Sequence, residues 1–331
     1  MALLKVKNLH THFSTPKGDL RAVDGVSFSI EHGQVLGLVG ESGSGKSVTA
    51  LSLMRLIPES VSITTADELI FDGVNLLDLS ETKMRSIRGR RIAMIFQDPM
   101  RSLNPVLTIG DQLAETLILH MALDKGAARK RAIDLLDRVG IARAEKCLDE
   151  YPHQFSGGMR QRVMIAMALS CSPQLLIADE ATTALDVTIQ AQIVDLIKDL
   201  QKEFSMAVIW ISHDLELVAS FCDQVAVMYA GRIVESGPAR DIFYRPSHGY
   251  TIGLLQCMPR IDDIGQPLRP IEGTPPNMTD PVNLCPFLPR CCIAVPNCQT
   301  EMPEYKEVSP SHIAACFGDV KPYRSESAFD Y

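Results

Sequence analysis

The feature that most constrains this chain is a glycine-rich segment of eight residues between an apolar run and a helix-compatible stretch. The segment is Gly40-Glu41-Ser42-Gly43-Ser44-Gly45-Lys46-Ser47, and it fits the pattern GxxxxGK[ST] at every fixed position. Its glycines allow the backbone to bend around a phosphate chain with the N–H groups pointing inward, and the following helix presents its positive end to the anion. The segment therefore predicts a nucleotide-binding loop, with Lys46 at the β- and γ-phosphates and Ser47 ligating magnesium.

A second apolar run, Leu175–Ala178, ends in two carboxylates, Asp179 and Glu180. Ligands of open α/β folds bind at the carboxyl ends of the strands, which is where these side chains should lie. Asp179 suits magnesium coordination, directly or through water, and Glu180 is placed to polarise an attacking water as a general base. The alternative interpretation is a solvated strand end with no role in chemistry.

The fold class follows from short apolar runs that alternate with helical stretches. The runs are mostly rich in β-branched residues, as strands buried on both faces should be, and comprise Gln34–Val39, Ile92–Phe96, Leu175–Ala178 and Ala207–Ile211. Apolar residues recur at spacings of three and four in Ala127–Val139 and Thr188–Phe204, which predicts helices. The alternation predicts an α/β fold with a mostly parallel sheet. Residues 100–154 read as largely helical, and we interpret them as an inserted helical subdomain.

Composition excludes several classes of protein. The chain has 331 residues, of which 46% are hydrophobic, so it can bury a large core, and its formal net charge is -8. That acidic balance lacks the basic footprint of a nucleic-acid-binding protein. No apolar run approaches the roughly eighteen residues that span a bilayer, and the first ten residues are too polar for a signal peptide. We therefore expect a cytosolic chain that does not bind nucleic acid.

Between the two proposed nucleotide motifs lies the segment Phe155-Ser156-Gly157-Gly158-Met159-Arg160-Gln161-Arg162. It resembles the signature LSGGQ of the ATP-binding-cassette (ABC) ATPase family, with Phe155 and Met159 departing from the commonest form. Met159 is similar to the variant of the dipeptide and oligopeptide branch. The resemblance implies that Ser156, Gly157 and Gly158 present backbone donors at a helix start to a γ-phosphate bound by an opposite subunit.

Three further segments resemble elements of the family and stand in the family's order along the chain. Gln97, in Phe96-Gln97-Asp98-Pro99, resembles the Q-loop, Asp186 in Ala184-Leu185-Asp186 the D-loop, and His213 the switch histidine. By resemblance, Gln97 contacts magnesium or water and senses membrane subunits, and Asp186 lines a dimer seam. His213 is implied to hold the γ-phosphate and Glu180 in geometry.

Two positions near these motifs need separate comment. Ala181 stands where the family usually has proline, and a proline there would restrict the conformation of Glu180. We expect activity to survive, because no side-chain function is lost. Phe13, about thirty residues before Lys46, is the candidate for the aromatic ring that stacks on adenine, with core packing as the alternative.

The nine cysteines are unevenly distributed, with the last five between Cys285 and Cys316. Cys285, Cys291, Cys298 and Cys316 are separated by five, six and seventeen residues, which is wider than paired CxxC zinc knuckles. Four thiolates can bind zinc or an iron–sulfur cluster, and the spacing favours the cluster. Four thiols without a metal remain an alternative, and Cys292 is either a spare thiol or an alternative ligand to Cys291.

The cysteine segment also resembles the C-terminal extension of dipeptide and oligopeptide ABC ATPases, which can carry a [4Fe-4S] cluster. The resemblance includes His248-Gly249-Tyr250-Thr251 and Pro289-Arg290-Cys291. The composition of the sequence changes near Pro259, where prolines become frequent and helical periodicity is lost. We therefore expect a second structural unit to begin there. Nothing in the sequence places the cysteines near the nucleotide site, and a cluster there is expected to be structural or redox-sensing.

The resemblance implies a P-loop ABC ATPase domain over residues 3–255, with a helical subdomain at about 100–154, and a C-terminal extension over 256–331. It implies an ATP-hydrolysing subunit, using ATP and Mg²⁺, that energises import of di- or oligopeptides from the cytoplasmic face of the inner membrane. The implied partners are a second ATP-binding subunit, two membrane permease subunits and an extracytoplasmic solute-binding protein.

Two other functions remain open at this point. The same motor could serve nickel complexes or opine-like solutes, because an ATPase chain contains no pocket for the transported solute. A soluble ABC ATPase acting on DNA or ribosomes is the other alternative. Such proteins usually carry coiled coils, zinc hooks or two cassettes, whereas this chain shows one cassette, no coiled coil and an acidic balance.

Overall fold

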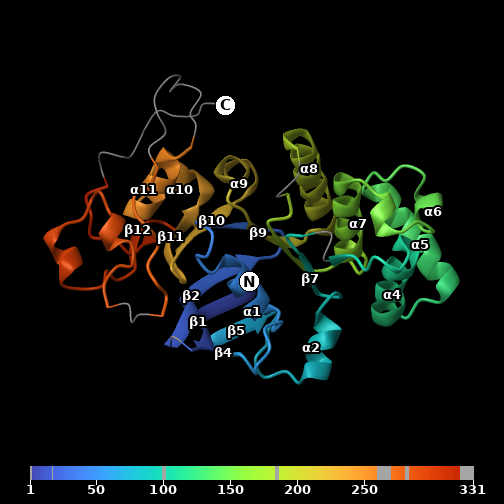
Figure 1. The fold of residues 1–331 in the computed structure, drawn as a ribbon, viewed down its shortest axis with the longest axis horizontal. Coiled ribbons are helices and arrows are strands. Elements are labelled where there is room, and N and C mark those ends of the chain that lie inside the picture. The colour runs from blue at the N-terminus through green and yellow to red at the C-terminus, as the bar shows by residue number, and fades with distance from the viewer. Residues whose placement is uncertain are drawn as a thin grey trace. The chain divides into compact units, whose positions relative to one another are not determined.

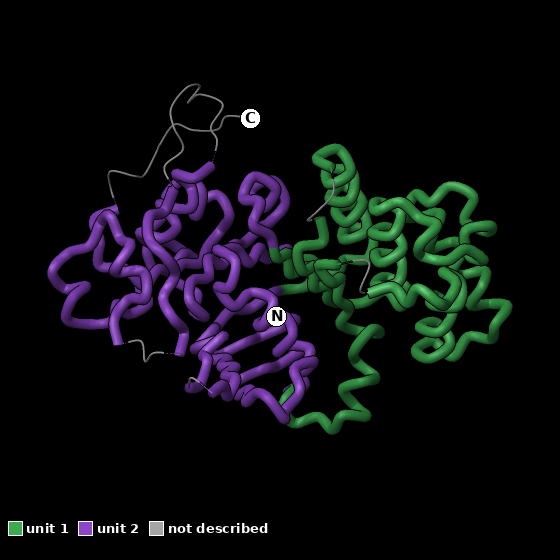
Figure 2. The backbone as a smooth tube through the Cα atoms, viewed as in Figure 1, with its two compact units in different colours: residues 1, 31–34, 76–211 green, residues 2–30, 35–75, 212–331 purple. Residues whose placement is uncertain are grey.

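The computed structural model describes residues 2–16, 18–98, 102–182, 186–258, 270–279 and 283–320 (Figure 1). These residues form two compact units, which Figure 2 colours separately. Unit 1 comprises residues 1, 31–34 and 76–211, and unit 2 comprises residues 2–30, 35–75 and 212–331. Both sides of the predicted boundary between residues 255 and 256 lie in unit 2, so this boundary stays a prediction.

Unit 1 combines a short parallel sheet with a group of helices. Its elements are α2 (Glu81–Ile87), β7 (Ile92–Ile95), α4 (Ile109–Met121), α5 (Lys125–Arg138), α6 (Ala144–Cys147), the 3₁₀ turn η1 (Pro152–Gln154), α7 (Gly157–Leu169), β8 (Leu175–Asp179), α8 (Val187–Phe204) and β9 (Ala207–Ile211). Strand β8 pairs in parallel with both β7 and β9. Every residue of β8 and β9 is buried, which explains why both read as uninterrupted apolar runs.

Residues 102–154 are largely helical and contain α4, α5, α6 and η1, while their interpretation as an inserted subdomain stays a prediction. Thr108 caps α4 by accepting a hydrogen bond from the Asp111 N–H at 3.1 Å, and Asp124 caps α5 by accepting one from Ala127 at 2.9 Å. The apolar faces of these helices pack on each other and on α7. The helices predicted over 127–139 and 188–204 are confirmed as α5 and α8.

Unit 2 holds most of the chain's β-structure. Its elements are β1 (Ala2–Thr15), β2 (Gly18–Glu31), β3 (Val35–Val39), α1 (Lys46–Leu53), β4 (Ser62–Thr65), β5 (Glu68–Phe71), β6 (Val74–Asn75), α9 (Leu215–Phe221), β10 (Gln224–Tyr229), β11 (Arg232–Pro238), α10 (Ala239–Tyr244), α11 (Gly249–Gln256), η2 (Leu288–Arg290), η3 (Pro296–Gln299), β12 (Lys306–Ser309) and β13 (His312–Ala314). One sheet has the order β2-β1-β5-β6, with β4 antiparallel to β1. The predicted α/β class with a parallel core is confirmed, because β3 and β10 are parallel.

The C-terminal residues continue the sheet of the cassette, although their sequence texture suggested a separate unit. Strand β13 pairs antiparallel with β11, and β12 pairs with β13. The buried side chains of Glu235 and His312 meet at 2.7 Å across this pairing, and the Ser247 N–H donates to the same Glu235 oxygen. The extension therefore belongs to the same compact unit as the glycine-rich loop.

An aromatic cluster closes the same region. The ring of Phe287 lies 5.3 Å from that of Tyr229 and 5.2 Å from that of Tyr250, and all three side chains are almost fully buried. Aromatic pairs at such distances add to the stability that area burial provides. None of the described helices is long and apolar enough to cross a membrane.

Candidate functional site

The glycine-rich loop lies between β3 and α1, as the sequence predicts. Gly40 and Gly45 have φ values of 151° and 105°, and Gly45 is the residue that caps α1. A Cβ atom would lie 2.1 Å from the Met228 carbonyl oxygen at Gly40 and 2.3 Å from that of Ala22 at Gly45. Both backbone conformation and space therefore demand glycine at these positions.

Polar groups inside the loop fit a bound phosphate chain. The Lys46 side chain is almost buried, and its ammonium donates to the carbonyls of Gly40 and Glu41 at 2.8 and 2.9 Å. The buried Ser44 hydroxyl has no hydrogen-bond partner among the described residues, while Ser47 is exposed at the first turn of α1. A positive side chain at a helix N-terminus is the arrangement that binds nucleotide phosphates.

Residues of the C-terminal extension contact this loop directly. The Glu41 N–H donates to the Tyr250 hydroxyl at 2.7 Å, and the Arg290 guanidinium binds both carboxylate oxygens of Glu41 at 2.8 and 3.1 Å. These hydrogen bonds hold the pKa of Arg290 above its ordinary value. The sequence gives no sign of this contact, in which Arg290, the residue before Cys291, binds the glycine-rich loop.

In unit 1, the structure brings two of the predicted site residues together. The Gln97 amide donates to a carboxylate oxygen of Glu180 at 2.6 Å, and Asp179 is buried at the end of β8. Glu180 has a φ of 48°, and its N–H donates to the Ile211 carbonyl at 3.0 Å. A left-handed backbone is uncommon for glutamate and is typical of functional sites held in place by their surroundings.

The other predicted positions lie on exposed turns. Ser156 caps α7 by accepting a hydrogen bond from the Met159 N–H at 3.3 Å, and a Cβ at Gly157 would meet no atom within 4 Å. Asp186 is exposed at the start of α8, and His213 is exposed between β9 and α9. Ala184 and Leu185 of the predicted D-loop and Pro99 after Gln97 lie outside the described residues.

Phe13 is half-buried on β1, opposite Ser62 of β4, so part of its ring remains accessible. Nearby, ligand atoms of His10, His12 and Asp24 lie within 4.8 Å of one another. Burial raises the pKa of Asp24, but the Arg232 guanidinium at 2.6 Å outweighs that effect and leaves the pKa below its ordinary value. Because Arg232 already neutralises this carboxylate, we assign no metal to the group.

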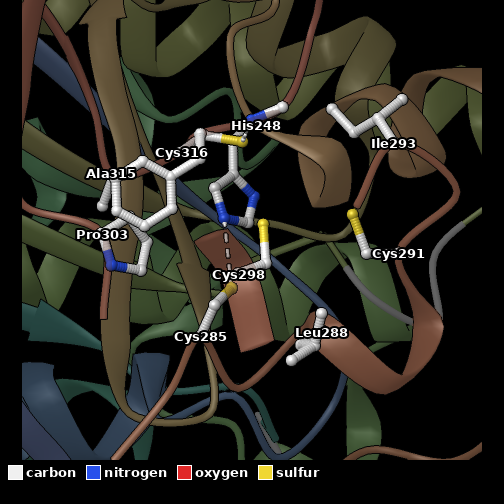
Figure 3. A pocket seen from close by; sticks show the side chains of 11 residues that line it. His248, Cys285, Leu288, Cys291, Ile293, Cys298, Pro303, Ala315 and Cys316 are labelled. Atoms are coloured by element: carbon white, nitrogen blue, oxygen red, sulfur yellow. Dashed lines mark hydrogen bonds between the residues drawn. The ribbon is translucent and has the colours of Figure 1, made fainter. Parts of the chain in front are cut away.

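The four predicted cysteine ligands line one cavity, shown in Figure 3. It is also lined by His248, whose Nε2 lies 3.8 Å from the Cys285 sulfur. Cys298 is buried and the other three are half-buried, whereas Cys292 is exposed and does not line the cavity. The structure thus groups Cys285, Cys291, Cys298 and Cys316 as the sequence predicts.

Burial determines the protonation of the groups around this cavity. It raises the pKa of Cys285 and Cys291 to about 11, raises that of Cys316, and lowers that of His248 to about 4. These thiols and the imidazole are therefore neutral near pH 7 when no cation is present. Because thiolates are the ligands of metals, a bound cation has to displace the thiol protons.

Three residues of this region were not assigned a role from the sequence. His248 and Tyr250 belong to the segment His248-Gly249-Tyr250-Thr251, and Arg290 belongs to Pro289-Arg290-Cys291. Both segments were named only because they resemble the C-terminal extension of the family. A buried tyrosine hydroxyl or arginine needs a hydrogen-bonding partner, but the sequence does not say which. Glu41 occupies a variable position of the loop pattern, so its partners could not be found from the motif.

The fold and its central loop define the ATP-binding cassette of ABC transporters, and comparison with known proteins agrees. The ABC transporter family matches residues 23–183, and the family described as "Oligopeptide/dipeptide transporter, C-terminal region" matches residues 234–298. The dimeric structure of MJ0796, a bacterial ABC transporter cassette, is similar with a TM-score of 0.64 and 28% identity, covering 72% of this chain and 99% of that one.

The similarity to curated proteins extends along nearly the whole chain. The oligopeptide transport ATP-binding protein OppD of Escherichia coli K12 is 51% identical over 320 residues, covering 97% of this chain and 94% of that protein. The dipeptide transport ATP-binding protein DppD of Bacillus subtilis 168 is 50% identical over 326 residues, covering 98% and 97%. This chain belongs to the family of oligopeptide and dipeptide transport ATP-binding proteins.

The conformation of the loop makes a testable distinction between two of its glycines. Gly43 also has a positive φ, 78°, but a Cβ there would meet no atom within 4 Å. We expect Gly43→Ala to lower the free energy of unfolding by about 1–2 kcal/mol, the cost of a left-handed alanine. Gly45→Ala adds a backbone clash and should cost at least about 3 kcal/mol. Urea unfolding measures both, and equal losses would contradict the loop geometry.

Proposed function

We propose that this chain binds and hydrolyses ATP to energise the import of dipeptides or oligopeptides through an ABC transporter. The observation that carries the proposal is the identity of about half of all residues with peptide-transport ATPases over nearly the full chain, cassette and extension together. Transport of nickel complexes or opine-like solutes is not favoured by these relatives, and neither is a soluble ATPase acting on DNA or ribosomes.

The nucleotide-binding roles are assigned to the loop of residues 40–47. Its backbone N–H groups bind the phosphates, with Lys46 at the β- and γ-phosphates and Ser47 as a magnesium ligand. Asp179, buried at the end of β8, is proposed as the second magnesium ligand, directly or through water. The partly accessible ring of Phe13 is proposed to stack on adenine. The buried ammonium and the unpaired Ser44 hydroxyl support the phosphate site.

Glu180 is proposed as the general base that takes a proton from the attacking water. Its contact with Gln97 supports this role, because the amide orients the Glu180 carboxylate. Its left-handed backbone, held by the hydrogen bond of its N–H to the Ile211 carbonyl, supports a defined position for Glu180 despite Ala181 in place of the usual proline. His213 is proposed to contact the γ-phosphate.

A second ATP-binding subunit is proposed to complete the site. Ser156, Gly157 and Gly158 lie at the uncovered N-terminus of α7, where backbone donors are available to a γ-phosphate held by another subunit. Asp186 and the 83% exposed Val187 lie at the start of α8 and are proposed to line the seam between the two subunits. An exposed apolar side chain at this point suits a contact surface.

Membrane partners are proposed to dock on the helical subdomain. Val106 and Leu119 are 75% and 73% exposed, and Ile118 and Met121 are also exposed, all on or beside α4. Several exposed apolar side chains on one short stretch of chain suit a protein–protein contact. We place the chain at the cytoplasmic face of the inner membrane, with two permease subunits and an extracytoplasmic solute-binding protein.

Replacing the proposed base should separate binding from hydrolysis. Glu180→Gln keeps the size and the contact with Gln97 but cannot accept a proton, so we expect MgATP affinity within about threefold of wild type and kcat lower by about 10²–10⁴. The MgATP affinity and kcat are measured in whichever preparation of the wild type hydrolyses ATP, either the isolated chain or the assembled transporter. Glu59→Gln, whose side chain is 92% exposed in the loop after α1, is the control and should change neither. Wild-type turnover in Glu180→Gln would remove Glu180 from this role.

Deletion of the gene tests the proposed cargo. We expect a deletion strain to lose uptake of radiolabelled di- and oligopeptides, to regain it with the wild-type gene, and not to regain it with Glu180→Gln. Uptake of nickel and of opines should stay unchanged. A strain that takes up peptides normally but loses nickel or opine uptake would contradict the peptide assignment and support the alternative cargo.

The thiol cavity is proposed to hold a [4Fe-4S] cluster. Four cysteines that line one pocket suit this group, and neutral thiols that lose their protons to metal provide the ligands. Cys285, Cys291, Cys298 and Cys316 would hold it. When bound, such a group cross-links the segments that carry its ligands and supplies a one-electron redox centre.

Anaerobic purification tests this assignment. We expect broad visible absorption and about four irons and four sulfides per chain, as a [4Fe-4S] centre requires. Cys298→Ser, at a buried lining position, should lose most of the iron, whereas Cys292→Ser, at the exposed neighbouring thiol, should keep it. One zinc per chain, or a metal-free protein, would contradict the cluster and leave the ATPase assignment intact.

A further inference from the structure

The contact between the extension and the nucleotide loop converges on Glu41. Its backbone N–H is bound by Tyr250, its carbonyl accepts from Lys46, and its carboxylate is bound by Arg290 at both oxygens. Every polar group of this one residue is therefore fixed. Because Lys46 contacts the Glu41 carbonyl at 2.9 Å, a shift of Glu41 would move the ammonium proposed to bind the phosphates.

Arg290 is a fully satisfied and nearly buried partner. Its side chain is only 6% exposed, and beyond Glu41 it donates to the Tyr229 hydroxyl at 3.1 Å and to the carbonyls of Glu272 and Ile271 at 2.9 and 3.3 Å. A guanidinium has five N–H donors, and these partners use all of them. Lysine has three donors and no planar fork, so it cannot reproduce this set.

The position of Arg290 is set by the thiol cavity. Arg290 ends the turn η2, whose Leu288 lines the cavity, and Cys285 and Cys291 flank the turn on its two sides. The Leu288 N–H donates to the Cys285 carbonyl at 3.0 Å, and the Cys291 N–H donates to the Leu288 carbonyl at 3.2 Å. A change in the spacing of these two cysteines therefore moves the backbone that carries Arg290.

Charge gives the contact a second consequence. Glu41 is 26% exposed in a loop that binds a polyanion, and Arg290 neutralises its carboxylate. Without the guanidinium, a carboxylate would face the phosphate charges unpaired, and like charges repel strongly where solvent screening is reduced. Arg290 therefore supports nucleotide binding both by fixing the loop and by removing this repulsion.

We propose that Arg290, with Tyr250, is a positioning residue of the nucleotide loop, and that ligation of the cysteines beside it controls MgATP affinity. The inference rests on the nucleotide-binding role proposed above for residues 40–47. It does not depend on which metal the thiols hold, because the link is the turn between Cys285 and Cys291. The extension thereby serves the ATP site in addition to packing on the cassette.

Equilibrium binding of MgATP to the purified chain tests the proposal. We expect Arg290→Ala to raise the Kd about tenfold and Arg290→Lys to raise it by a smaller factor, because only the charge remains. Adding Glu41→Gln to Arg290→Ala should restore part of the affinity by removing the unpaired carboxylate. Arg129→Ala breaks a two-bond pair with Asp149 on the exposed surface of unit 1 and should leave the Kd unchanged.

A double-mutant cycle tests the link to the thiols. We expect Cys298→Ser to raise the Kd for MgATP and Cys292→Ser to leave it unchanged. The double variant Cys298→Ser/Arg290→Ala should have a Kd no higher than that of the single variant with the higher Kd. Additive effects, or no effect of Cys298→Ser, would overturn the coupling, and an unchanged Kd in Arg290→Ala would overturn the positioning role. Should Arg290→Ala fail to fold, as judged by circular dichroism, Arg290→Lys takes its place in the cycle. A wild-type chain that does not bind MgATP would instead contradict the nucleotide site itself.

Discussion

The backbone of residues 40–47 adopts a conformation that only glycine allows at two positions. Gly40 and Gly45 adopt left-handed φ values with carbonyl oxygens close behind them, a conformation that the loop cannot hold by its own hydrogen bonds alone. Neighbouring segments supply support: the Gly231 N–H, in the turn between β10 and β11, donates to the Ser44 carbonyl, and the Tyr250 hydroxyl of α11 accepts from the Glu41 N–H. A phosphate-binding loop works only if its donors point inward before the anion arrives, so this support is part of the chemistry.

The C-terminal extension is best understood as a part of that support. It continues the sheet through β13, joins β11 by the buried contact of Glu235 with His312, and closes on the aromatic cluster around Phe287. These contacts place Arg290 at the loop and the four thiols beside Arg290. One compact unit thus contains both the loop proposed to bind phosphate and the thiol cavity proposed to hold a cluster, although they are far apart in the sequence.

Prediction from the sequence succeeded where the information is local. The strands β3, β7, β8 and β9 are short and buried, and the loop pattern has four fixed positions, so both were found. The pairing of β13 with β11 and the contact of Arg290 with Glu41 join residues far apart in sequence. Neither contact produces a periodicity or a residue spacing by which it could be predicted from the sequence. The prediction of four grouped cysteines succeeded because their spacing is itself a pattern, whereas His248 was not found because a single buried histidine carries none.

Hydrogen exchange at the amides of residues 40–47 tests the central claim most directly, because it reports the support of this loop without requiring turnover. We expect MgATP to slow exchange across the loop in wild type. We also expect Tyr250→Phe, which keeps the buried ring and removes only the hydroxyl, to speed exchange of the Glu41 amide while the amides of β3 stay unchanged. Loop amides unaffected by MgATP would contradict the nucleotide site, and a Glu41 amide unaffected by Tyr250→Phe would contradict its support by the extension.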